Sequence, residues 1–153
     1  REVYNLGFSG NAKLDLEIAE YMASVKDPGV FVLDYAPNCT ADLIDAKAEE
    51  FFRILRDAHP DVSVIIVEPP YYPYKDFDRE VYKDFAQRIQ AQRSLYKKLK
   101  KSGEKKLFYI KSDQLLNGNM DATVDGVHYT DLGSVIHAEA IVPVIRRALR
   151  MTK

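Results

Sequence analysis

The chain has 153 residues, of which 46% are hydrophobic and 29% charged, and its formal net charge is -1. This composition is typical of one soluble globular domain and excludes a collagen, a coiled coil or a disordered tail. The balanced charge gives no field that would attract nucleic acid, and no apolar run approaches the roughly 20 residues that span a bilayer. The single cysteine, Cys39, makes no internal disulfide, so the compartment stays undetermined.

Short apolar runs alternate with helical patterns along the chain. We expect strands over 3–8, 30–33, 62–67 and 107–110, and helices near 14–22, 40–59, 79–101 and 131–150. This order predicts an α/β fold with a parallel sheet and helices on both faces. Ligands of such sheets bind beyond the carboxyl ends of the strands. The candidate functional segments are therefore the loops 9–11, 34–39, 68–74 and 112–128.

Among the three histidines, His128 lies in the setting that favours catalysis. It follows Asp125 by three residues, after the last predicted strand and just before a helix. A carboxylate held in the same turn accepts the imidazole N–H, fixes its tautomer and stabilises the cation that forms when the ring takes a proton. The structural alternative is an aspartate that caps a turn beside a histidine with no catalytic role.

Three segments resemble sequence blocks of the SGNH hydrolases, also called GDSL-type lipases and esterases. The segment 125–128, Asp-Gly-Val-His, resembles the block that supplies the acid and base of a Ser-His-Asp triad. The segments 5–11 and 34–38 resemble the two blocks that supply the donors of the oxyanion hole. The resemblance implies that Asp125 and His128 are catalytic, and that the Gly10 N–H and the Asn38 amide form an oxyanion hole. It covers essentially the whole chain, and it implies a three-layer α/β/α, flavodoxin-like fold that needs no metal or cofactor.

The chain also departs from the family pattern. Ala36 and Cys39 replace a glycine and an aspartate of the block that contains Asn38, and the Gly-Asp-Ser block with the nucleophilic serine is absent. We therefore expect residues 1–153 to be a single SGNH-hydrolase-like domain, truncated at its N-terminus, that lacks its first βα unit.

A missing first strand has a consequence for the sheet. In the flavodoxin-like strand order 2-1-3-4-5, the missing strand is strand 1. It would lie between strand 2, expected over 3–8, and strand 3, expected over 30–33. We predict that another copy of the first strand completes the sheet, by self-association, or that the two neighbouring strands pair directly.

Two residues of the chain are alternative nucleophiles. Ser9 lies in Gly-Phe-Ser-Gly, which is one residue short of the Gly-x-Ser-x-Gly elbow, and it precedes Asp125 and His128 in α/β-hydrolase order. The non-catalytic interpretation of Ser9 is a helix N-cap. Cys39 is the other alternative, paired with His128, and its simpler interpretation is a small packed side chain.

The resemblance implies a serine esterase or acylhydrolase that acts on a carboxylic ester, either a small molecule or an acetylated carbohydrate. Tyr71 and Tyr72 follow a buried strand and would form an aromatic wall of the substrate pocket. Without the family's serine, we expect this chain itself to be inactive. The alternative hypothesis is a catalytically dead fragment or a non-enzymatic α/β domain.

Overall fold

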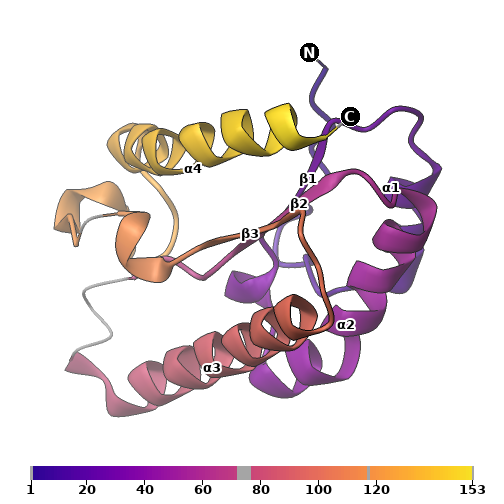
Figure 1. The fold of residues 1–153 in the computed structure, drawn as a ribbon. Coiled ribbons are helices and arrows are strands. Elements are labelled where there is room, and N and C mark those ends of the chain that lie inside the picture. Colours follow the sequence, from indigo (N-terminus) through magenta and orange to yellow (C-terminus); the bar gives the residue numbers. More distant parts are fainter. Residues whose placement is uncertain (1, 72–76, 117, 153) are drawn as a thin grey trace.

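The computed structural model describes residues 2–71, 77–116 and 118–152. Three strands form a parallel sheet in the order β1-β2-β3: β1 (Val30–Leu33), β2 (Ser63–Val67) and β3 (Leu107–Ile110). The helices are α1 (Leu16–Ser24), α2 (Ala41–Ala58), α3 (Arg79–Lys101) and α4 (Asp131–Met151), with 3-10 turns at Ala36–Asn38, Ser112–Gln114 and Met120–Ala122. Helices α1 to α3 cover one face of the sheet and α4 the other (Figure 1). The predicted α/β fold is confirmed.

The central strand β2 is buried along its whole length, and its side chains alternate between two cores. Val64 and Ile66 pack with residues of α1, α2 and α3, whereas Ile65 and Val67 pack on the face that α4 covers. A strand that helices cover on both sides needs apolar residues at every position. This explains the uninterrupted apolar run in the sequence.

Residues 2–8 form no strand, which corrects the expectation for 3–8. They are largely exposed, and their local contacts are turn bonds, such as the Gly7 N–H to the Asn5 side chain at 2.9 Å. A strand needs a partner for its N–H and C=O groups, and none of the described strands pairs with this segment. The predicted direct pairing with β1 is therefore wrong, whereas completion of the sheet by another copy remains a prediction.

The first turn of α4 is fixed to the 3-10 turn that precedes it. Thr130 caps the helix by accepting the Gly133 N–H at 3.1 Å. A Cβ on Gly133 would lie 1.9 Å from the carbonyl oxygen of Ala122, so only glycine fits at this contact. The loop between Ala122 and Thr130 is consequently anchored at both ends. None of the helices described is long and apolar enough to cross a bilayer.

Candidate active site

The loop between Ala122 and α4 holds Asp125 against His128. One carboxylate oxygen, Oδ2, lies 2.6 Å from His128 Nδ1, and the other, Oδ1, accepts the backbone N–H groups of Val127 at 2.9 Å and His128 at 2.8 Å. Gly126 allows this tight turn because its φ of 87° lies in the left-handed region. The backbone N–H of His128, then its imidazole, hold the pKa of Asp125 well below its usual range. The carboxylate is therefore ionised at neutral pH.

The imidazole of His128 presents its other nitrogen to the outside of the molecule. The side chain is 77% exposed, and within the described residues Nε2 makes no hydrogen bond. Because the Asp125 carboxylate accepts the Nδ1 proton, the neutral ring carries a free lone pair on Nε2. This is the protonation state that a general base requires.

Gly10 and Asn38 lie in a second cluster, which a sulfur hydrogen bond holds together. Gly10 occupies a left-handed turn with φ 66°, and Asn38 ends the 3-10 turn that follows β1. The Cys39 thiol donates to the carbonyl oxygen of Ala12 at 3.3 Å and so ties these two loops to each other. Burial raises the pKa of this thiol to about 11. These features argue against Cys39 as a nucleophile, because the reactive form is the thiolate.

Ser9 also lies outside the setting that a nucleophile elbow needs. The residues before it form no strand, and α1 begins only at Leu16, with Asp15 at the N-cap position. The suggested role of Ser9 as a helix N-cap is therefore wrong. A nucleophile elbow is a sharp turn from a strand directly into a helix. The local structure around Ser9 does not provide this turn.

Arg88 of α3 positions the loop that carries Asn38. Its Nη1 donates to the carbonyl oxygens of Ala36 at 3.3 Å and Pro37 at 2.9 Å, and its Nη2 lies 2.6 Å from Asp84. The sequence gives no signal for this role, because Arg88 is one of many basic residues on α3. The contact spans about 50 residues along the chain and is visible only in the fold.

Polar side chains extend from the residue after His128, through α4, to the end of β1. The Tyr129 hydroxyl lies 3.1 Å from His137 Nδ1, and His137 Nε2 lies 3.9 Å from Asp34 at the end of β1. Burial lowers the pKa of His137, and desolvation raises the pKa of Asp34 to about 6. Among the described residues no hydrogen bond joins His128 directly to Gly10 or Asn38.

We expect Asp34→Asn to raise the free energy of unfolding at pH 7 and to leave it nearly unchanged below about pH 4. Since the folded pKa of about 6 exceeds the ordinary aspartate value of 3.8, the folded chain binds this proton more tightly. The stability contributed by the proton is complete below the unfolded pKa and is lost as the pH rises through the folded pKa. Urea denaturation at several pH values measures the difference. An equal gain at low pH would contradict the explanation, and Asp45→Asn, at another surface aspartate on α2, is the control.

The loop after β2 contains one residue that the sequence interpretation assigned wrongly and one whose role stays a prediction. Glu68 was grouped with the substrate loop, yet it is fully buried and accepts hydrogen bonds from Arg93, Tyr109 and Ser112. Its role is structural. Tyr71 is half-buried and meets the edge of Phe85 at a ring distance of 6.2 Å. Tyr72, the other predicted wall residue, lies outside the described residues.

Comparisons with known proteins agree with the fold and with the sequence resemblance. A GDSL-like lipase from Bacteroides ovatus superposes with a TM-score of 0.85 at 30% identity, over 93% of this chain and 42% of its own. The salicylyl-acyltransferase SsfX3 of a tetracycline biosynthetic pathway has a TM-score of 0.69 at 17% identity, over 91% of this chain and 42% of its own, and so shares the fold.

The chain thus spans less than half the length of both structures. No functionally curated protein matches it significantly. The profile of the GDSL-like Lipase/Acylhydrolase family, in contrast, matches residues 1–146. The protein therefore belongs to the GDSL-like Lipase/Acylhydrolase family.

Proposed function

We propose that this chain supplies the acid–base pair and the oxyanion donors of an ester hydrolase. The observation that carries the proposal is the Asp125–His128 pair, in which an ionised carboxylate holds Nδ1 at 2.6 Å and leaves Nε2 accessible. Catalytic triads use this arrangement to place a basic nitrogen beside a serine hydroxyl. Membership of a lipase and acylhydrolase family supports the same chemistry.

The proposed reaction has two halves. A serine Oγ attacks the ester carbonyl carbon while His128 Nε2 takes the hydroxyl proton, and the carbonyl π electrons move onto oxygen. The Gly10 N–H and the Asn38 amide would donate to that oxyanion, where losing one donor typically costs about 3–4 kcal/mol of transition-state stabilisation. The C–O bond to the alcohol then breaks and His128 returns the proton to the alcohol. Water repeats the sequence on the acyl-serine.

We propose further that the nucleophilic serine lies outside these 153 residues and that residues 1–153 are one domain lacking its first βα unit. No Gly-Asp-Ser segment occurs in the sequence. Cys39 is a buried thiol, and Ser9 follows an irregular segment rather than a strand. These observations place neither Ser9 nor Cys39, the two alternative nucleophiles, in the setting of an activated nucleophile.

The proposed substrate is a carboxylic ester, with an acetylated carbohydrate as the specific candidate. Tyr71 follows β2 at the carboxyl edge of the sheet, and its ring offers a stacking face and a hydroxyl to a sugar. Because the triad acts on the ester carbonyl alone, the acyl and alcohol groups are selected by such surrounding residues. Comparing p-nitrophenyl acetate with a peracetylated sugar tests this preference.

Two assays test the function. The first compares p-nitrophenyl acetate hydrolysis by this chain and by its His128→Ala variant, and we expect the same background rate from both. A lower rate for the variant would show that His128 takes part in hydrolysis by this chain, and Ser9→Ala and Cys39→Ala would then test each of these residues as the nucleophile. The second treats the longer polypeptide that carries this chain and a serine block with a fluorophosphonate probe, which labels activated serines. We expect labelling that His128→Ala abolishes, and absent labelling would refute the ester hydrolase.

A further inference from the structure

The loop that carries Asp125 and His128 is a short hairpin. Its two ends pair in an antiparallel bridge between Thr123 and Tyr129, and the Val124 N–H donates to the His128 carbonyl oxygen at 2.9 Å. The side chains of Asp125 and His128 are 51% and 77% exposed. Because the hydrophobic core does not enclose them, their positions depend on the contacts that hold the hairpin itself.

The Tyr129 side chain fastens this hairpin to α4. Its hydroxyl lies 3.1 Å from Nδ1 of His137 in the second turn of the helix, and the two ring centroids are 4.9 Å apart. The His137 side chain is only 15% exposed. An imidazole that is largely buried on a regular helix has few rotamers available, so it offers a fixed partner. Tyr129 thus joins the residue beside His128 to a rigid element.

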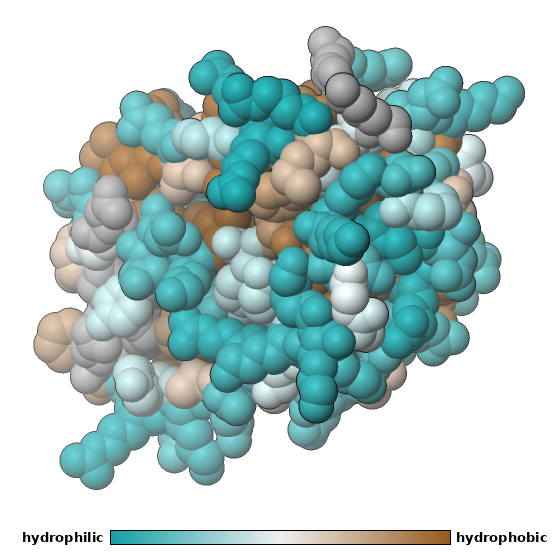
Figure 2. Space-filling view, viewed as in Figure 1, coloured by the Kyte–Doolittle hydropathy of each residue, from teal (hydrophilic) through white to brown (hydrophobic). Residues whose placement is uncertain are grey.

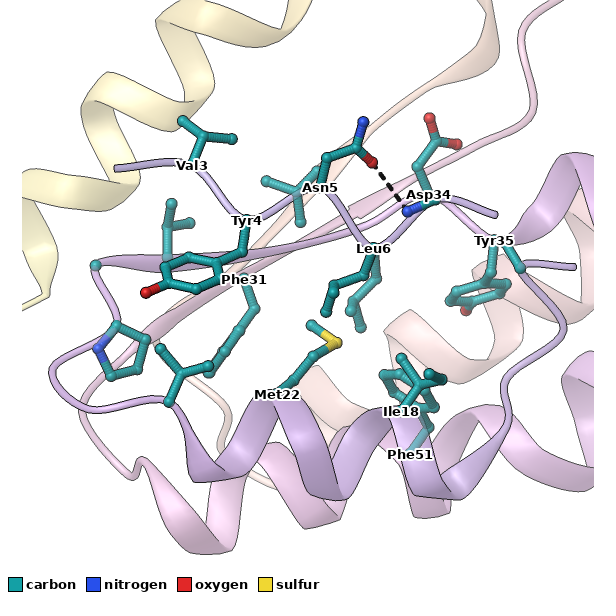
Figure 3. A pocket seen from close by; sticks show the side chains of 18 of the residues that line it. Val3, Tyr4, Asn5, Leu6, Ile18, Met22, Phe31, Asp34, Tyr35 and Phe51 are labelled. Carbon is teal, nitrogen blue, oxygen red and sulfur yellow. Dashed lines mark hydrogen bonds between the residues drawn. The ribbon is translucent and has the colours of Figure 1, made fainter. Parts of the chain in front are cut away.

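Asp34 approaches the second nitrogen of the His137 imidazole. Its Oδ2 lies 3.9 Å from Nε2. Asp34 directly follows β1, and in Figure 3 its carboxylate points away from Tyr35 and from Ile18 of α1. Since α1 lies on one face of the sheet and α4 on the other, this direction brings the carboxylate to α4. The end of β1 therefore supplies a charge to the helix residue that holds the hairpin.

We propose that His137 is a positioning residue, which holds the hairpin of His128 in place through Tyr129. Asp34 selects the tautomer that this contact needs. A carboxylate near Nε2 favours the ring that carries its proton on that nitrogen, since the N–H dipole then points to the negative charge. The lone pair of Nδ1 is left to accept the Tyr129 O–H. His128 has the opposite tautomer, because Asp125 lies beside its Nδ1.

The protonation states of the two groups agree with this assignment. Burial lowers the pKa of His137, so the imidazole is neutral at pH 7, and desolvation raises the pKa of Asp34 to about 6, so most of this carboxylate is still ionised there. A desolvated carboxylate lowers stability at neutral pH. Keeping it beside His137 is a compromise between stability and function of the kind that active sites show.

The benefit to catalysis rests on the proposed function, because it consists of keeping His128 Nε2 where a serine hydroxyl would meet it. A displacement of a reacting group by about 1 Å costs up to roughly 10²-fold in rate. The contact between Tyr129 and His137 itself does not depend on hydrolysis. The two ideas are therefore tested separately.

Amide hydrogen exchange of this chain tests the contact. Tyr129→Phe keeps the ring and removes the hydroxyl, and we expect the amides of Val124 and His128 to exchange about fivefold faster, the effect of one lost hydrogen bond. His137→Asn places an acceptor on Cγ, where Nδ1 is attached, and should keep the native rates. His137→Gln places it one carbon further and should behave as Tyr129→Phe. Tyr21→Phe, at an exposed position of α1, is the control and should change neither rate.

Two further measurements address the tautomer and the catalytic role. Nitrogen NMR at pH 7 should show His137 protonated on Nε2, and Asp34→Asn should move its nitrogen shifts toward those of a mixture of both tautomers. In a polypeptide that combines this chain with the proposed serine, Tyr129→Phe should lower kcat about tenfold and leave KM unchanged, because only the placement of the base changes.

The outcomes separate the alternatives. Native exchange at Val124 and His128 in Tyr129→Phe would overturn the positioning role, and so would equal rates in His137→Asn and His137→Gln. Faster exchange that the amides of β2 share would show a general loosening of the fold and would also overturn it. A His137 ring protonated on Nδ1 would remove the role of Asp34. Faster local exchange without ester hydrolysis by the combined polypeptide would support the contact and count against the ester hydrolase.

Discussion

Replacing Asp125 by asparagine is expected to lower kcat for ester hydrolysis about 10⁴-fold, the scale of this change in a serine triad. This expectation applies to a polypeptide that combines this chain with the serine proposed to lie outside it. Oδ1 of Asp125 accepts two backbone N–H groups, so the amide oxygen of an asparagine would keep that position. Its NH₂ group would then face His128 Nδ1. The ring would have to carry its proton on Nε2, and Nε2 would no longer accept the serine proton.

The tautomer can be read without any activity. Nitrogen NMR of this chain should show the neutral His128 ring protonated on Nδ1 in the native sequence and on Nε2 after Asp125→Asn. Asp113→Asn, at an exposed position in the preceding 3-10 turn, is the matched control and should alter neither the tautomer nor kcat. An unchanged tautomer in Asp125→Asn, or full activity, would refute the role assigned to the carboxylate.

The sequence predicted the elements whose stability depends on local pattern. Arg79–Lys101 forms the expected helix, with Asp78 accepting the N–H groups of Glu80 and Val81 as its N-cap. The buried strand Ser63–Val67 matches its apolar run. Residues 3–8 have the same β-prone composition, yet they form no strand. A strand depends on an adjacent strand for its hydrogen bonds, and composition does not report whether one is present.

In the candidate site, too, contacts between residues close in sequence could be predicted, and contacts between distant residues could not. Asp125 and His128 are three residues apart, so a single turn brings them into contact and spacing is sufficient to predict it. The contact between Cys39 and Ala12 joins loops 27 residues apart, and the Asp34–His137 approach joins β1 to α4. Neither follows from spacing. Long-range polar contacts depend on the crossing of whole elements, which one sequence does not specify.

The protein surface gives the remaining context for the site. Hydrophilic side chains cover most of the face seen in Figure 2, and apolar ones gather over the first half of α4. In this helix Leu132 and Val135 are 46% and 55% exposed, and they follow His128 closely in the chain.

Glu68→Ala is expected to lower the free energy of unfolding by about 3 kcal/mol, at the lower end of the range for breaking a buried ion pair. Glu68 is fully buried at the end of β2. Its carboxylate accepts the Tyr109 hydroxyl at 2.7 Å and the Ser112 N–H at 2.8 Å, and it pairs with Arg93. Because Arg93 is 46% exposed, its charge can return to water, which limits the loss. Urea denaturation measures the change.

Two variants identify the source of that loss. Tyr109→Phe removes one hydrogen bond to the same carboxylate and should cost about 1 kcal/mol. Glu49→Ala breaks two surface ion pairs, with Arg53 at 2.8 Å and with Lys98 of α3, and should change stability little. If Glu68→Ala cost no more than Glu49→Ala, the buried network would not hold α3, β3 and the loop after β3 together. The larger loss would show that Glu68 organises the edge of the sheet from which the loop leading to Asp125 and His128 begins.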